Sequence, residues 1–182
     1  MGIDREIALI EKCKEGDHSA FSSLIGLYNE KLFGYLFRFA GNRDLAKDWM
    51  QEVLIKTWKN INRYNEQNKF SSWLFSIAHN TAIDGIRKLK TQSREILTDN
   101  IDTNTLSENP YEKVIHDETK QVIERIVNGL PAKQKHVFLL RMHAELSFKE
   151  IADLTKEPLN TVLSHMHYAV KKLRNELKVN DE

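Results

Sequence analysis

Apolar residues recur along this chain at spacings of three and four, and this periodicity predicts helices from end to end, with no convincing strand. In the first half we expect Gly16 to end one helix in a left-handed cap and Asp17 to cap the next. Ser71 or Ser72 is the expected cap of the last helix of this half. The helices expected here cover about 4–15, 17–40, 43–60 and 70–88.

The second half predicts a helical hairpin. Pro131 separates two expected helices, and S-F-K-E at 147–150 predicts a capping box that begins a short third one. Pro158 blocks continuation of that short helix. Two helices joined by a short turn, the second polar and basic on its outer face, are typical of a helix-turn-helix. The other helices expected here cover about 118–130, 132–143 and 160–177.

The stretch that joins the halves has no apolar periodicity and is rich in Asp, Asn, Thr and Ser. Residues 95–118 carry one lysine against seven carboxylates, whereas the segments on either side are mildly basic and the whole chain has a net charge of +1. We therefore expect an all-α fold of two small helical domains, 1–95 and 118–178, joined by a flexible acidic linker at 96–117.

The helix expected over 70–88 has two different faces. Apolar positions at helical spacing can face a core: Trp73, Leu74, Ile77 and Ala78. The opposite face carries amides, hydroxyls and one arginine: Ser76, Asn80, Asp84 and Arg87. These residue types form hydrogen bonds with base edges, and the cations that follow, Lys88, Lys90 and Arg94, suit a phosphate backbone. The pattern predicts recognition of nucleic acid.

Composition excludes several other classes of protein. A charged content of 29% and the absence of an apolar run of about 18 residues argue against membrane insertion. The N-terminus lacks an apolar signal core, and the lone Cys13 excludes an internal disulfide, so we expect a cytoplasmic protein. His165 and His167, two apart on a helix, face different directions and cannot share an ion. No phosphate loop or nucleophile elbow is present, and we expect no metal, no cofactor and no enzymatic activity.

Three sequence blocks together resemble the extracytoplasmic-function (ECF) sigma factors of the sigma-70 family. They are D-W-M-Q-E-V-L-I-K-T-W at 48–58, the stretch 70–88, and L-P-A-K-Q-K-H-V-F-L-L-R at 130–141 with L-S-F-K-E-I-A at 146–152. The resemblance implies a sigma domain 2-like unit, a helix-turn-helix sigma domain 4-like unit and the function of an alternative sigma factor. It further implies three partners, namely core RNA polymerase, promoter DNA and an anti-sigma factor.

The resemblance also assigns roles to residues. Those implied to bind polymerase are Asp48, Gln51, Glu52, Leu54 and Ile55. Those implied to capture the minus-ten element as a single strand are Tyr64, Lys69, Trp73, Ser76, Asn80, Asp84, Arg87 and Lys88, with Trp73 equally typical of a core position. Those implied to contact the minus-thirty-five duplex are Thr161, Leu163, Ser164, His165, His167, Tyr168, Lys171 and Lys172.

The last helix departs from the family pattern. Where the family commonly reads G-T-V-K-S-R-L-x-R-A, this chain reads N-T-V-L-S-H-M-H-Y-A, so Leu163, His165 and Tyr168 replace the cations. Bidentate arginine–guanine contacts are therefore absent at these positions, and a shifted promoter preference is expected.

Two other functions remain open from the sequence. A duplex-binding regulator acting without polymerase would use 147–177 alone, and it would leave the polar face of 70–88 and the edge at 48–55 without a purpose. A nucleic-acid-modifying enzyme would need clustered carboxylates or a zinc set, and we find neither pattern.

Overall fold

The computed structural model describes residues 2–65, 69–96 and 118–179, and these residues are helical with no strand. The chain divides into two compact units, Met1–Gln92 and Ser93–Glu182. The first contains α1 (Gly2–Lys14), α2 (His18–Gly26), α3 (Asn29–Ala40), α4 (Arg43–Asn60), the 3₁₀ turn η1 (Ile61–Arg63) and most of α5 (Phe70–Ile96). The second contains α6 (Glu118–Asn128), α7 (Ala132–Met142), α8 (Phe148–Thr155) and α9 (Leu159–Val179). The all-α prediction is confirmed. The flexible linker expected at 96–117 lies outside the described residues except for Ile96.

The entry to α2 follows the sequence prediction. Gly16 has a left-handed φ of +94°, and the Asp17 carboxylate accepts hydrogen bonds from the backbone N–H groups of Ser19 and Ala20 at 2.7 and 3.0 Å. These bonds satisfy donors that the first turn of a helix leaves unpaired, and they lower the pKa of the Asp17 carboxyl.

The single helix expected over 17–40 is wrong. The α-helical hydrogen-bond pattern stops at Leu27 and Tyr28, which form a turn by donating to carbonyls three residues earlier, so that α2 and α3 are separate elements. The Tyr28 hydroxyl donates to Glu6 of α1, and its ring packs against Phe70 with centroids 5.6 Å apart. These contacts are tertiary, and a break of two residues barely disturbs the apolar periodicity on either side, so the pattern did not reveal it.

The helix expected over 70–88 begins at the predicted residue but is longer than predicted, and its expected cap is wrong. It starts at Phe70 and runs to Ile96, so the expected cap at Ser71 or Ser72 is wrong and both residues lie inside the first turn. The carbonyl of Lys69 accepts the first helical hydrogen bond, from Trp73 N at 3.2 Å. The Phe70 ring is fully buried, so packing anchors this end of the helix in the core.

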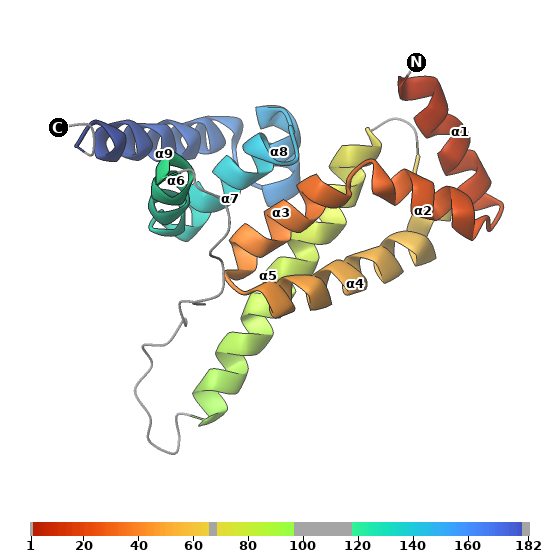
Figure 1. The fold of residues 1–182 in the computed structure, drawn as a ribbon, viewed down its shortest axis with the longest axis horizontal. Coiled ribbons are helices and arrows are strands. Elements are labelled where there is room, and N and C mark those ends of the chain that lie inside the picture. The colour runs from red at the N-terminus through yellow and green to blue at the C-terminus, as the bar shows by residue number, and fades with distance from the viewer. Residues whose placement is uncertain (1, 66–68, 97–117, 180–182) are drawn as a thin grey trace. The chain divides into compact units, whose positions relative to one another are not determined.

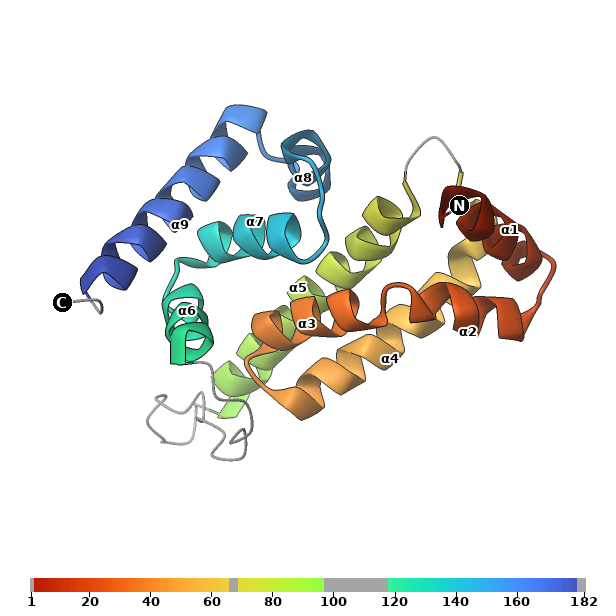
Figure 2. The same cartoon turned by 45° about the horizontal axis from the view of Figure 1, so that its top comes forward.

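Figures 1 and 2 show α3, α4 and α5 packed side by side, and these helices enclose the core of the first unit. Tyr35 of α3 meets Phe75 of α5 edge to face at 5.7 Å, and both rings are fully buried. At Gly85, α5 lies so near to α4 that an added Cβ atom would be 2.5 Å from Cε2 of Trp49. Only glycine fits there without displacing the indole.

In the second unit, α6, α7 and α8 all lie against α9 (Figure 1). The predicted capping box is confirmed, because Ser147 Oγ accepts from Glu150 N at 3.2 Å and Glu150 Oε2 accepts from Ser147 N at 2.7 Å. Lys156, in the left-handed region at φ 56°, ends α8 and begins the turn into α9. This turn joins α8 and α9, the two helices of the helix-turn-helix pattern.

Candidate nucleic-acid interface

One edge of α4 carries the residues implied to bind polymerase. Asp48, Gln51 and Ile55 are exposed, Ile55 at 55% of its surface, while Leu54 is half-buried. Glu52 is also half-buried, and its carboxylate lies 2.7 Å from the ammonium of Lys56. The edge therefore presents carboxylates, an amide and apolar surface together on one helix, and the Trp49 and Val53 side chains beneath it are buried.

Sequence reasoning missed Lys56. Its ammonium lies 2.7 Å from Glu52 on α4 and donates to Thr81 Oγ1 on α5 at 3.1 Å. Thr81 is only 1% exposed, so this hydrogen bond ties the α4 edge to the helix beside it. The contact arises from two helices crossing, and spacing within α4 gave no sign of it.

The polar face of α5 points to solvent, as expected. Asn80, Asp84 and Arg87 are exposed, and Lys88 follows them. The Asp84 carboxylate lies 3.7 Å from the Arg87 guanidinium. The Ser76 hydroxyl donates to the Trp73 carbonyl at 2.7 Å. Within the described residues, no hydrogen bond is recorded for the Asn80 amide, so its donors and acceptor remain available to a ligand.

The buried side of the same helix also carries His79, which pairs with a tyrosine of α3. His79 is 7% exposed, and its Nδ1 lies 3.1 Å from the hydroxyl of the fully buried Tyr35. Burial lowers the pKa of His79, because the charged imidazolium loses its hydration there. His79 therefore contributes to the packed core of this unit, whereas the side chain of its neighbour Asn80 is exposed.

Aromatic residues that flank positions 66–68 in the sequence form a cluster. Tyr64 and Trp73 have ring centroids 5.4 Å apart, and each ring lies within 5.7 Å of Phe70. Trp73 is half-buried and Lys69 is exposed, whereas Tyr64 is only 7% exposed. A base could stack on Tyr64 only after the cluster rearranged, while Trp73 keeps part of its surface at the edge of the cluster.

The outer face of α9 carries several apolar and aromatic side chains. Leu163 and Tyr168 are 40% and 55% exposed, and Ser164 and His167 are also exposed. Thr161 is half-buried, and Ser164 donates its hydroxyl proton to the Asn160 carbonyl at 2.8 Å. Leucine, tyrosine and histidine thus make up much of the surface that the first turns offer to a partner.

His165 does not join that surface. It is 20% exposed, and its Nε2 lies 3.4 Å from the Glu157 carboxylate in the turn before α9. Lys133 of α7 lies 2.7 Å from the same carboxylate. The imidazole therefore faces the turn between α8 and α9. The sequence pattern places His165 within α9 but could not show which way its side chain points.

Lys171 and Lys172 are neighbours in sequence but differ in environment. Lys172 donates to the Gly129 carbonyl at 2.8 Å and lies 3.7 Å from Glu176, so it fastens α9 to the chain after α6. Lys171 is exposed, and it has no ion pair within the described residues.

The described residues contain neither a cluster of metal-ligand side chains nor a helix that could span a membrane. No three His, Cys, Asp or Glu side chains gather there as ligands for an ion. No described helix is both long and apolar enough to cross a bilayer. Cys13 is buried, and burial raises the pKa of its thiol.

Comparison with known proteins decides the family. The family model described as sigma-70 region 2 matches residues 24–92, and the model described as sigma-70, region 4, matches residues 120–173. The chain belongs to the sigma-70 family. Among curated proteins, the ECF RNA polymerase sigma factor SigW of Bacillus subtilis (strain 168) is 30% identical, and the match covers 93% of this chain and 95% of SigW. The ECF RNA polymerase sigma-E factor of Escherichia coli (strain K12) is 28% identical, with 93% of each chain covered.

Solved structures share the fold of this chain. The sigma factor RpoE of Bartonella quintana, in complex with the anti-sigma factor NepR, matches with a TM-score of 0.70 at 21% identity over 87% of this chain and 97% of that one. CnrH, in complex with the cytosolic domain of CnrY, matches with a TM-score of 0.67 at 16% identity over 96% and 98%. This ECF sigma factor is therefore an alternative sigma factor, which directs RNA polymerase in transcription initiation.

Proposed function

We propose that this ECF sigma factor acts through three surfaces, one for polymerase and two for promoter DNA. The α4 edge, Asp48, Gln51, Glu52, Leu54 and Ile55, binds core RNA polymerase. The α5 face with the aromatic cluster beside it captures the opened minus-ten strand. The outer face of α9 contacts the upstream duplex at the minus-thirty-five element. The factor has no catalytic activity of its own and works in the cytoplasm, where its polymerase is.

The two faces of α5 carry the proposal. Leu74, Phe75 and Ala78 on one face are fully buried, so they account for the helix's place in the fold. Asn80 and Arg87 on the other face are exposed and contribute nothing to that core. An uncharged amide on a mid-helix position costs helix propensity without capping anything, which supports a role in binding. Amides and guanidinium groups bond base edges directly.

A related complex and exposed apolar side chains support regulation by an anti-sigma factor. The first solved structure named above is a complex of a sigma factor with an anti-sigma factor. Here Ile55, Leu159 and Leu163 expose between 40% and 55% of their surfaces, and apolar side chains of this size favour a protein partner over water. We propose that an anti-sigma factor covers these side chains and so competes with polymerase and with DNA.

The direct test is a transcription reaction with core RNA polymerase, with and without this protein, on fragmented genomic DNA. New start sites that depend on the protein and share upstream motifs are expected. Silence from a folded protein with a matched polymerase, together with tight duplex binding by the protein alone, would support the duplex-binding regulator instead.

An Asn80→Ala variant tests the capture face. We expect weaker capture of the single-stranded minus-ten element and fewer open complexes, with polymerase binding unchanged. The matched control is Asn29→Ala, which removes an exposed amide from α3 in the same unit. Loss of polymerase binding or of the fold in the Asn80 variant would show that Asn80 is structural.

A further inference from the structure

Three side chains of the first unit form a network to which the proposed surfaces give no role. The ammonium of Lys56 lies 2.7 Å from the Glu52 carboxylate on α4, and it donates to Thr81 Oγ1 on α5 at 3.1 Å. Figures 1 and 2 show these two helices side by side. Lys56 therefore connects a residue proposed to bind polymerase with a buried position of the neighbouring helix.

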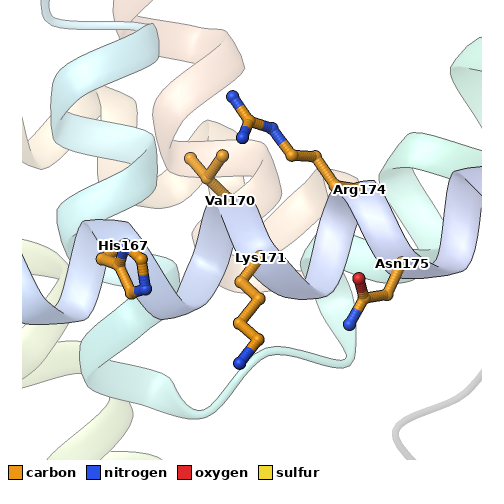
Figure 3. Close-up of a pocket in the computed structure, with 5 residues that line it drawn as sticks. All are labelled: His167, Val170, Lys171, Arg174 and Asn175. Atoms are coloured by element: carbon orange, nitrogen blue, oxygen red, sulfur yellow. The ribbon is translucent and has the colours of Figure 1, made fainter.

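The network fixes the Lys56 side chain in place. Thr81 is 1% exposed, so its hydroxyl is an acceptor that the core holds still. Lys171 of α9 provides the contrast, because its side chain extends away from the helix in Figure 3 and has no ion pair within the part of the chain that the structure describes. A lysine held by partners on two helices has lost on folding the rotamer freedom that a free surface lysine keeps.

Glu52 keeps one carboxylate oxygen for a partner. Lys56 lies against Oε1, and no contact of Oε2 is recorded within residues 2–65, 69–96 and 118–179. The Glu52 side chain retains 44% of its exposed surface. An ionised carboxylate offers about four lone-pair sites. Glu52 can therefore keep its pair with Lys56 and accept a charge-assisted hydrogen bond from polymerase at the same time.

The other polar residues of the α4 edge are not held in this way. Asp48 and Gln51 are exposed, and neither side chain has a recorded contact among the described residues. Ordering a free side chain of this kind when a partner binds weakens the affinity by about two- to twelvefold. Glu52 differs from both, because its contact with Lys56 restricts the carboxylate before any partner arrives.

We propose that Lys56 is a positioning residue, which holds the Glu52 carboxylate in the arrangement that core RNA polymerase binds. The buried Thr81 hydroxyl anchors the ammonium from the other side. This inference rests on the proposed function and adds to it a residue that acts on polymerase through Glu52 and not by direct contact.

Two effects of Lys56 on polymerase binding oppose each other. Its charge offsets that of Glu52 and so weakens the attraction of a cationic partner, whereas its position reduces the cost of ordering the carboxylate. The Lys56 and Glu52 side chains are 38% and 44% exposed, so water and salt screen the effect of charge. The positioning effect therefore dominates at physiological salt.

The test measures the affinity of full-length variants for core RNA polymerase, by competition with a fluorescently labelled wild-type factor at about 150 mM salt. Lys56→Met removes the ammonium and keeps an apolar stem, and Lys56→Arg keeps the charge and the donors. Lys59→Met is the matched control, because Lys59 is exposed on the same helix and has no recorded contact among the described residues. Thr81→Val keeps the ion pair and removes only the anchor, and it takes the place of Lys56→Met if that variant does not fold.

Lys56→Met should bind polymerase about two- to twelvefold more weakly, and Thr81→Val should lose part of this. Lys56→Arg should recover most of the affinity, and Lys59→Met should match the wild type. In a Glu52→Ala background, Lys56→Met should cause no further loss, because no carboxylate remains to be positioned. A purely structural role of Lys56 would weaken binding equally in both backgrounds.

The inference is overturned if Lys56→Met binds as tightly as the wild type, if Lys59→Met loses as much, if Lys56→Arg recovers nothing, or if the loss persists unchanged in the Glu52→Ala background. Glu52→Ala alone tests the proposed polymerase surface. Unchanged affinity in that variant would remove Glu52 from the α4 edge and overturn the inference with it. Weaker binding by Glu52→Ala beside normal binding by Lys56→Met would overturn the inference and leave the proposed surface standing.

Discussion

Replacing Gly85 with alanine should destabilise the first unit, although alanine is the better helix former. An ideal Cβ at this position would lie 2.5 Å from Cε2 and 2.6 Å from Cζ2 of Trp49. Non-bonded carbon atoms normally stay about 3.5–4.0 Å apart, so the two helices must separate by about 1 Å or the indole must move. Trp49 is 4% exposed and packs against Phe39 with centroids 6.4 Å apart, which leaves it little room to turn aside.

The magnitude follows from two opposing effects. Overpacking a tight core costs about 1–3 kcal/mol, and the restricted indole places this site near the upper value. Alanine recovers about 1 kcal/mol of helix propensity relative to glycine. The net expectation is a loss of about 2 kcal/mol, which in a unit of this size lowers the melting temperature by roughly 8–16 °C.

The assay is intrinsic tryptophan fluorescence during urea unfolding of the full chain. All three tryptophans, Trp49, Trp58 and Trp73, lie in the first unit, so the signal reports that unit alone. Gly26→Ala is the matched control, because nothing lies within 4 Å of its added Cβ. The free energy of unfolding of the control should equal the wild-type value or exceed it by up to about 1 kcal/mol.

A double-mutant cycle with Trp49→Phe sharpens the test. A smaller ring makes room for the alanine, so the double variant should be more stable than the two separate losses predict. An unfolding midpoint for Gly85→Ala at or above the wild-type value, or strict additivity with Trp49→Phe, would refute the close approach of α4 and α5.

Three further predictions follow from the structure. Because burial lowers the pKa of His79 below its ordinary 6.5, the unfolded chain takes up that proton first, so the free energy of unfolding should fall below pH 6.5 by at most about 1.4 kcal/mol per pH unit. Tryptophan-detected unfolding at about pH 7.5 and 5.5 measures this, and His79→Gln should flatten the dependence. Ser147→Ala removes half of the capping box and should cost about 1 kcal/mol, seen as faster amide hydrogen exchange in α8, whereas unchanged exchange would mean that the cap is dispensable. Glu157→Gln should leave Lys133 without its ion pair but lower stability by less than about 1 kcal/mol, because Lys133 is largely exposed, and a larger loss in a thermal melt would show that the contact of Glu157 with His165 also contributes.

The sequence correctly predicted the features that depend on residues close to one another in the chain. The Asp17 cap, the Ser147–Glu150 capping box and the two faces of α5 are each set by residues within one or two helical turns, and the structure contains all of them. The all-α class followed from the same local periodicity.

Features set by tertiary contact were not predictable in this way. The break at Tyr28 depends on Glu6 and on Phe70, which is 42 residues away in the chain. His165 turns toward Glu157 because the α8–α9 turn brings a carboxylate beneath it. Burial of Tyr64 likewise depends on rings from α5, and spacing around residue 64 carries no sign of them.

The division of α5 into a buried face and an unused polar face bears on how such a factor can change over generations. Substitutions at Asn80, Asp84 or Arg87 touch no core residue, so each should alter stability by no more than about 0.5 kcal/mol. Substitutions at Leu74 or Phe75 instead open cavities that cost several kcal/mol. If this face captures the minus-ten strand as proposed, promoter preference can change one residue at a time without risk to folding, and the set of genes that the factor controls can diverge while its core stays intact.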